Sequence, residues 1–341
     1  MSEKSGLPSG LRARLEEQYN LRVKTCARAR SAWRIETDAG PRFVKRTQAD
    51  RESLPFVTGL HDYLDRTWPG IAPRIHRSRT GEAAFQYGLD NYLLLDALPG
   101  READYLNPGD PGAVAAGLAA FHRAARGYDL ASAPPSRRRH GSWPGIMTAR
   151  LADLDRFWRL AKTRGGCFDR AYLALRAAFL PEAAAARDYL LASAYPRLAA
   201  DAALSREICH HDLAHHNALI EGDTVRFLDL DYAVGDTVLH DLANLCGHLL
   251  RLFGWELDPV RAVLARYWAG PPPPAALAVL GGMLLWPQDC WQIGRQFYDE
   301  HQPWTEDEFL ALLRRKCGKT RARRGFLRRF WREYQLPALP L

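Results

Sequence analysis

One short polar segment, ICHHDLAHHN, constrains this chain more than any other part of it. In this segment Asp212 is followed five residues later by Asn217, and Asp229 comes twelve residues further on. Two short apolar runs, 218–220 and 225–230, flank the triplet Glu-Gly-Asp, which predicts the turn of a β-hairpin. We therefore expect a loop that carries an acid and an amide, followed by a hairpin that ends in a second acid.

This pattern suits phosphoryl transfer. That reaction needs a carboxylate to orient the attacking hydroxyl and oxygen ligands to hold Mg²⁺ against a triphosphate. On a tight loop, Asp212 can supply the carboxylate and Asn217 one metal ligand. Asp229, just past the hairpin, can supply a second ligand, and Mg²⁺ prefers such hard oxygen donors. The segment predicts a magnesium-dependent phosphotransfer site.

The rest of the chain divides into a strand-rich N-terminal third and a helical remainder. Residues 21–46 read as a three-stranded meander with a turn at Asp-Ala-Gly, and residues 50–66 read as a helix. Beyond residue 100, apolar residues recur at helical spacing, interrupted mainly by the hairpin. The two parts meet near residues 96–100, so we expect an α+β fold.

A lysine of the meander is the candidate phosphate contact. Lys45 ends a predicted strand, where it can neutralise the charge of a triphosphate. An acid on the following helix could hold this lysine in place. Glu52 is the first candidate, and Asp50 and Asp62 remain open alternatives.

A basic run marks the C-terminal part of the chain, whose formal net charge is +8. Residues 314–332 carry ten Lys and Arg and no acid, a composition that could bind a polyanion. The interleaved Phe326, Leu327, Phe330 and Trp331 recur at helical spacing, which favours an amphipathic helix docked on a core. Nucleic acid is therefore not an expected partner, although a basic binding tail stays open as a third hypothesis.

Neither membrane nor export signals are predicted. No apolar run reaches the ~20 residues that span a bilayer, and residues 1–10 lack the apolar segment of a secretory signal. The six cysteines form no CxxC pair and fit no zinc or disulfide framework. Free thiols favour a reducing compartment, so we expect a cytoplasmic location and no membrane partner.

These segments resemble the aminoglycoside-phosphotransferase and choline-kinase superfamily, which is protein-kinase-like. The motif His210-x-Asp212-x4-Asn217 with Asp229 carries that resemblance, and Lys45 after a strand fits it. A softer similarity points to the CotS-type kinase-like proteins of the spore coat. It runs over residues 92–102, 105–108, 118–122, 168–169, 209–217, 241–243 and 296–298.

The resemblance implies a bilobal fold. A small antiparallel-sheet N-lobe, residues 1–98, would bind nucleotide, and a large, mainly helical C-lobe, residues 99–341, would carry the catalytic loop and the metal-binding hairpin. It implies ATP and Mg²⁺ as cofactors and an unknown hydroxyl acceptor, on a small molecule or a coat protein. Other spore coat proteins become possible partners, and the spore coat a possible location.

The resemblance also implies roles for the residues that match the motif. Asp212 would be the catalytic base. Asn217 and Asp229 would bind Mg²⁺, and Asp231 would add a direct or indirect metal contact. Lys45 would contact the ATP phosphates.

Five further positions acquire supporting roles from the resemblance. The hinge that meets adenine through backbone groups would be Asp96, Ala97 and Leu98. His210 and Asp241 would brace the catalytic loop without reacting.

One departure keeps two hypotheses open. The predicted loop between the first two strands, residues 28–31, has no glycine, although a phosphate-covering loop usually needs one for close backbone approach. Arg28 and Arg30 either contact phosphate through their side chains or exclude nucleotide. The chain is thus either an ATP-dependent phosphotransferase or a weakly active or inactive kinase-like component of coat assembly.

Overall fold

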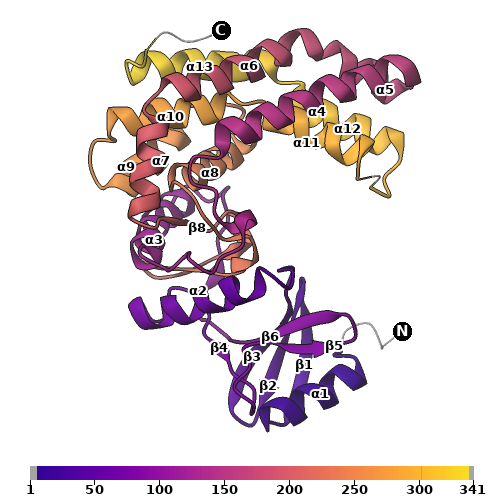
Figure 1. Cartoon of the computed structure of the whole chain (residues 1–341), viewed down its shortest axis with the longest axis vertical. Helices are drawn as coiled ribbons and strands as arrows, with labels where there is room; N and C mark the ends of the chain where they lie inside the picture. Colours follow the sequence, from indigo (N-terminus) through magenta and orange to yellow (C-terminus); the bar gives the residue numbers. More distant parts are fainter. Residues whose placement is uncertain (1–5, 301, 338–341) are drawn as a thin grey trace. The chain divides into compact units, whose positions relative to one another are not determined.

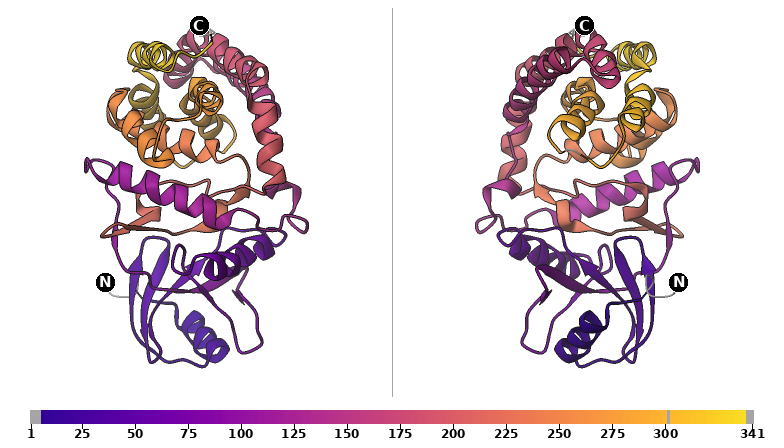
Figure 2. Two further views of the ribbon diagram at one scale, coloured as in Figure 1. Left: turned by 90° about the vertical axis from the view of Figure 1, so that its left-hand side faces the viewer. Right: turned by 90° about the vertical axis from the view of Figure 1, so that its right-hand side faces the viewer.

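The computed structural model describes residues 6–300 and 302–337, which fall into two compact units (Figure 1). The first unit joins the chain up to residue 138 with residues 206–235, and the second joins residues 139–205 with the chain from residue 236 onward. Within the described residues all strands belong to the first unit, and the second is helical (Figure 2). The α+β class is confirmed, and the predicted boundary at residue 98 falls inside the first unit.

A six-stranded antiparallel sheet forms the N-terminal part of the first unit. Its strand order is β1-β2-β3-β6-β4, and β5 pairs with β6. The strands are β1 (Val23–Ala29), β2 (Ala32–Thr37), β3 (Gly40–Arg46), β4 (Ile75–His76), β5 (Phe85–Tyr87) and β6 (Asp90–Asp96). The predicted meander is confirmed. Its second turn ends at Gly40, whose φ of +96° lies in the region that favours glycine.

Helix α1 (Ser9–Tyr19) covers this sheet with an apolar stripe. Leu11 and Leu15 lie one turn apart, and both are fully buried against Ile35 and Val44 of the strands. Burying each leucine contributes roughly 1.5–3 kcal/mol to folding. This packing fixes β3, the strand whose end carries Lys45.

The segment that carries the predicted motif forms small sheets of its own. β9 (Ala218–Glu221) pairs with β10 (Thr224–Phe227) as the expected hairpin, and β7 (Arg101–Glu102) adds to β9. β8 (Ile208–Cys209) pairs with β11 (Val234–Gly235), which closes the segment from both ends.

Two helices support these strands, α2 (Leu54–Thr67) and α3 (Asp110–Ala125). Gly117 of α3 packs directly on Val225 of the hairpin, and a Cβ atom at this position would collide with the valine side chain. The hairpin is therefore held close against α3.

The second unit consists of ten helices among the described residues. They are α4 (Trp143–Arg164), α5 (Cys167–Ala174), α6 (Arg176–Ala192), α7 (Tyr195–Leu204), α8 (Leu239–Leu252), α9 (Asp258–Trp268), α10 (Pro274–Leu285), α11 (Gln288–Tyr298), α12 (Glu306–Cys317) and α13 (Thr320–Glu333). Short 3-10 turns, η1 (Pro135–Arg137), η2 (His215–Asn217) and η3 (Leu230–Tyr232), lie in the first unit.

The basic C-terminal run forms the docked amphipathic helix that its pattern predicts. In α13, Phe326, Leu327, Phe330 and Trp331 are all buried. Arg323 is buried as well, because its guanidinium pairs with Glu182 of α6. The apolar face and one buried arginine therefore serve packing within the second unit.

Two further sequence-based expectations concern membrane-spanning helices and disulfide bonds. In residues 6–300 and 302–337, no helix combines the length and apolar character needed to cross a bilayer. All six cysteines are free thiols; four of them are buried, whereas Cys26 is half-buried and Cys167 is exposed. Residues 1–5 of the stretch that was assessed for a secretory signal lie outside the described residues.

Candidate active site

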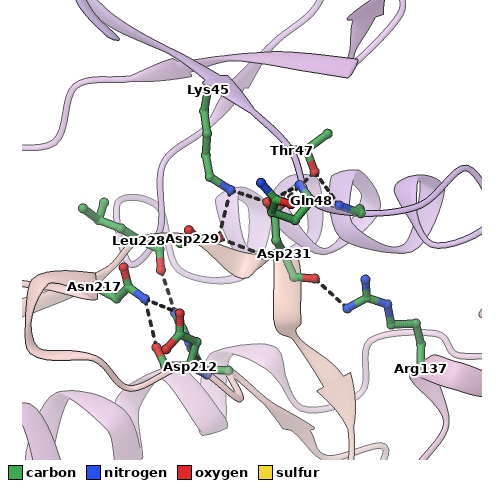
Figure 3. Close-up of polar contacts among 11 residues, drawn as sticks. Lys45, Thr47, Gln48, Arg137, Asp212, Asn217, Leu228, Asp229 and Asp231 are labelled. Atoms are coloured by element: carbon green, nitrogen blue, oxygen red, sulfur yellow. Dashed lines mark hydrogen bonds and ion pairs between the residues drawn. The ribbon is translucent and has the colours of Figure 1, made fainter. Parts of the chain in front are cut away.

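Lys45 is the centre of the candidate site, and it is buried at the end of β3 (Figure 3). Its Nζ atom donates to Asp229 Oδ1 at 2.8 Å and also to Asp231 Oδ2. The lysine side chain is 9% exposed and that of Asp231 only 1%. A cation at this depth needs paired acids, and the hairpin region supplies two of them.

The predicted acid partner of Lys45 is corrected by these contacts. Glu52 is exposed and lies just before α2, and the ion pairs of Lys45 go to Asp229 and Asp231. The two alternatives are engaged elsewhere, since Asp50 accepts from the Ser53 backbone and Asp62 pairs with Arg77.

Asp231 anchors the hairpin region to the strand-rich part of this unit. Its Oδ1 accepts from the Thr47 hydroxyl at 2.8 Å, and its Oδ2 accepts from the Gln48 N–H at 2.7 Å. Its backbone carbonyl accepts from Arg137 Nη1 at 2.7 Å. Lys45, Thr47 and Gln48 together use three of the about four acceptor directions of the carboxylate. Asp231 therefore has room for at most one further contact.

Asp229 has a constrained backbone conformation. Its φ of +60° and ψ of 70° are left-handed, which costs a residue other than glycine about 1 kcal/mol or more. Burial raises the pKa of its carboxyl, but the charge and hydrogen bond of Lys45 outweigh burial, so the pKa lies below its ordinary value. The group is thus a carboxylate at neutral pH, the form that binds a metal ion.

Asp212 and Asn217 contact each other directly, as a shared loop site requires. Asn217 Nδ2 donates to Asp212 Oδ2 at 2.9 Å and to the Asp212 carbonyl at 3.1 Å. The amide is nearly buried and is thereby oriented with its NH₂ group toward Asp212. Among the described residues, none donates a hydrogen bond to Asn217 Oδ1, so this oxygen remains available as a ligand.

His210 and Leu228 tie the loop to the strand that leads into Asp229. His210 Nε2 contacts the Leu228 carbonyl at 2.7 Å, and its Nδ1 accepts from the Asp212 N–H at 3.3 Å. Because Nδ1 accepts, the proton is assigned to Nε2. The Leu228 N–H donates to the Asn217 carbonyl at 2.8 Å, which links the amide residue to the residue before Asp229.

The segment predicted to meet adenine follows β6. The Asp96 side chain is occupied by basic neighbours, with His76 Nε2 at 2.7 Å and Arg74 Nε at 3.3 Å. Ala97 and Leu98 are half-buried, and in the described part of the chain no residue hydrogen-bonds to their backbone groups. Their N–H and C=O groups are free to meet a planar base.

The glycine-free loop between β1 and β2 is tethered by its arginines. Arg30 Nε and Nη2 donate to the two carboxylate oxygens of Glu102 at 3.0 and 2.5 Å. Arg28 stacks on Trp33, with its guanidinium carbon 4.1 Å from the ring centroid. We call the Arg30–Glu102 pair the loop latch. Sequence reasoning missed it because β7, which carries Glu102, pairs with the distant hairpin.

Asp241, a predicted brace, is fully buried in the first turn of α8 in the second unit.

The sequence also gave no indication of Thr47, Gln48 or Arg137 as parts of the site. Thr47 and Gln48 come two and three residues after Lys45, and their position just past the predicted strand was the available signal.

Comparison with known proteins identifies the family. Residues 25–280, well over half of the chain, match the model of the phosphotransferase enzyme family. The chain belongs to the phosphotransferase enzyme family. As a member, it is 25% identical over 311 residues to spore coat protein S of Bacillus subtilis (strain 168), which covers 89% of this chain and 88% of that protein. The predicted superfamily and the similarity to a spore coat protein are both confirmed.

Solved structures confirm the kinase-like phosphotransferase fold of this family member. An aminoglycoside phosphotransferase from Alicyclobacillus acidocaldarius superposes with a TM-score of 0.79 at 18% identity, covering 98% of this chain and 99% of the other. Spectinomycin phosphotransferase, solved with ADP and spectinomycin, gives a TM-score of 0.68 at 10% identity, covering 96% and 99%. The chain is thus a kinase-like member of its family that resembles a spore coat protein.

Proposed function

We propose that this chain is an ATP- and Mg²⁺-dependent phosphotransferase that acts on a hydroxyl of a small molecule or of a coat protein. One observation carries the proposal. Asn217 donates to Asp212 and accepts a hydrogen bond from the N–H of Leu228, the residue before Asp229, and Asp229 is paired with Lys45. A base, an amide oxygen, an acid and a cation are the parts that phosphoryl transfer uses.

The donor set suits a magnesium ion. Asp229 offers an ionised carboxylate and Asn217 an uncommitted amide oxygen, which are hard ligands of the kind Mg²⁺ takes. Asp231 can add one contact beside its protein donors. Bound Mg²⁺ would neutralise charge on the phosphate oxygens.

The chain's own residues then act as follows. Lys45 exchanges its contact with Asp229 for the nucleotide phosphates, because both are anionic partners of a buried ammonium. Asp212 orients the acceptor hydroxyl and receives its proton, held in position by Asn217 and the Nδ1 atom of His210. His210 stays a positioning residue, and Asp241 a brace in the second unit.

Adenine would meet the backbone of Ala97 and Leu98 after Asp96. In this proposal residues 1–98 form the nucleotide-binding lobe, and residues 99–341 carry the catalytic loop and the acceptor-binding helices. The protein would work in the cytoplasm or at the spore coat.

A second candidate function is a structural role in spore coat assembly with little or no turnover. The similarity to spore coat protein S favours it. The loop latch favours it as well, because Arg30 is held by Glu102 and not left free for phosphate. This alternative predicts that the chain associates with coat proteins whether or not it binds nucleotide.

Thermal unfolding with Mg·ATP separates the two candidates. The phosphotransferase proposal predicts that Mg·ATP raises the Tm of the wild type by several degrees at saturating concentration, since a ligand that binds only the folded state stabilises it. It predicts a smaller rise for Asp229→Ala. ATP consumption that requires Asp212 would then establish turnover.

The matched control is Asp223→Ala, an exposed acid in the turn of the same hairpin. It should respond to Mg·ATP as the wild type does. A wild type whose Tm is unaffected by Mg·ATP, while coat proteins still bind the chain, would favour the assembly role.

A further inference from the structure

The second unit contains an arginine whose charge has no acid partner. Arg150 lies on α4 and is half-buried, and its guanidinium stacks on Trp291 of α11, 4.0 Å from the ring centroid. It also faces Trp143, at 5.4 Å. Helices α4 and α11 pack together over this region (Figure 1). Its hydrogen bond goes to the neutral Gln288 Oε1, at 2.9 Å, and no described residue forms an ion pair with it.

The nearby acids are occupied or neutral. Asp153, one turn along α4, accepts from Trp291 Nε1 at 3.1 Å and from Arg156 at 3.3 Å. Asp236 is fully buried and accepts from Trp143 Nε1 at 2.7 Å, and burial raises its pKa to about 8. Neither carboxyl forms an ion pair with Arg150, and the charge of Asp153 acts on it only through space.

A second arginine lies near Arg150, although its charge is paired with an acid. Arg295, one turn along α11 from Trp291, has its guanidinium 5.0 Å from the same indole ring. Its terminal nitrogen pairs with Glu300 at 2.6 Å, but its Nε atom is buried and finds no acceptor among the described residues. A buried N–H without an acceptor calls for an explanation such as a missing ligand or water.

Burial and these neighbouring charges also weaken the hold of Arg150 on its proton. Burial, followed by the charges of Arg295 and Arg139, lowers the pKa of Arg150 to about 10. His240, stacked on Trp143 at 4.4 Å, has its pKa lowered by burial to about 4 and is neutral at pH 7. The neutral imidazole adds no positive charge, and Arg150 has no ion-pair partner among the described residues.

We propose that Arg150 and Arg295, stacked on Trp291, form a binding site in the second unit for the carboxylate or phosphate group of a small hydroxy compound. Guanidinium forks bind such oxyanions with charge-assisted hydrogen bonds, and the indole rings hold the forks in place. Naming this compound as the phosphoryl acceptor rests on the proposed function, whereas the anion site does not. Because its two guanidiniums are positively charged, the site should repel polycationic ligands such as aminoglycosides.

Binding measurements with small probes test this site. D-glycerate carries a hydroxyl with a carboxylate, and glycerol 3-phosphate a hydroxyl with a phosphate, so the two arms distinguish the anions. Glycerol and choline serve as neutral and cationic probes, and potassium chloride matches the ionic strength. Tm shifts and tryptophan fluorescence report binding.

We expect at least one anionic probe to raise the Tm of the wild type and the uncharged and cationic probes to leave it unchanged. Arg150→Met should weaken binding about tenfold or more, as the loss of a charge-assisted contact predicts. Arg159→Met is the matched control, because Arg159 is exposed on the same helix and pairs with Asp155. Its binding should equal that of the wild type.

Equal anion binding by the wild type and Arg150→Met would overturn the site, as would an absence of binding by either anion. If Arg150→Met does not fold, Arg150→Lys keeps the charge without the fork and should still show weaker binding. Lys45→Met separates this proposal from the proposed function. It should lose the Mg·ATP response and keep the anion response, so each proposal can fail alone.

Discussion

The two units treat a buried cation in opposite ways. In the first unit, Lys45 is matched by two carboxylates, Asp229 and Asp231, and is almost fully enclosed. In the second unit, Arg150 is half-buried between tryptophans and has a neutral amide as its hydrogen-bond acceptor. In the first arrangement two acids surround one cation, and an incoming ligand must rearrange these contacts. In the second the cation has no ion-pair partner, and we propose that an anion supplies one.

This difference indicates how each cluster would select its ligand, which we propose to be a nucleotide with metal at Lys45 and a small anion at Arg150. In the proposed function, Lys45 exchanges Asp229 for the nucleotide phosphates and Asp229 binds the metal ion, which would couple nucleotide binding to metal binding. An arginine on an aromatic surface is already oriented and needs no exchange. Variants in the two clusters should therefore differ in both stability and binding.

The largest expected effect comes from Asp229→Ala. Removing the carboxylate that we propose as a metal ligand should lower magnesium-dependent ATP turnover by about 10³-fold, since metal stabilisation of phosphoryl transfer amounts to several kcal/mol. ATP consumption at varied Mg²⁺ measures this. Asp223→Ala, in the exposed hairpin turn, should keep full turnover, and equal losses in both variants would contradict the assigned role.

Lys45→Met should follow, with a loss of about 3–5 kcal/mol in the free energy of unfolding. It leaves the buried Asp231 and the half-buried Asp229 without their cation, and breaking a buried pair on one side is strongly destabilising. Chemical denaturation at pH 7 measures the loss. Lys24→Met, at an exposed position of β1, is the matched control and should change stability little.

Lys45→Met should also change how the free energy of unfolding depends on acid pH. The pKa of Asp229 is lowered in the folded protein, so this group contributes stability above its ordinary value of 3.8 that is lost as the pH falls through the folded value. In Lys45→Met that contribution disappears. The unfolding free energy of the variant should therefore decline less than that of the wild type below about pH 4.

Arg150→Met should have a much smaller effect on stability, within about 1 kcal/mol and of either sign. It removes a charge that has no acid partner and leaves no buried carboxylate behind. The variant no longer bears the cost of burying this charge, and this gain offsets the packing that the arginine side chain contributes. Denaturation alongside Arg159→Met checks this. A loss as large as that of Lys45→Met would show that Arg150 has a structural role.

The smallest effect is expected from Glu102→Gln, which opens the loop latch. Both side chains of the latch are about half exposed, so the Tm should hardly change. The association rate of a fluorescent ATP analogue should rise a few-fold if the latch slows entry, and raising salt should speed the wild type more than the variant. Glu36→Gln, which breaks the exposed pair with Arg34, should leave the rate unchanged.

The sequence predicted those features that depend on neighbouring residues. Asp212, Asn217 and the hairpin before Asp229 lie within one short segment, so spacing and turn chemistry were sufficient. The strands of the meander followed from alternation and from the turn at Gly40. The docking of α13 followed from its apolar spacing.

Partners that are distant in the chain were not predictable in this way. Lys45 and Asp229 are separated by 184 positions, and a search along the nearest helix led to Glu52. Arg150 and Gln288 are separated by 138 positions on two helices whose periodicity gives no pairing. The left-handed backbone conformation of Asp229 also could not be predicted from the residue type, because an aspartate seldom adopts this conformation.

The most direct measurement of the central claim is a crystal structure of the full chain with Mg²⁺ and a non-hydrolysable ATP analogue. The account predicts a metal ion bound by Asn217 Oδ1 and Asp229, with Lys45 Nζ moved to the phosphates. A structure in which Lys45 keeps both carboxylates while the nucleotide is absent or the metal ion binds elsewhere would contradict it.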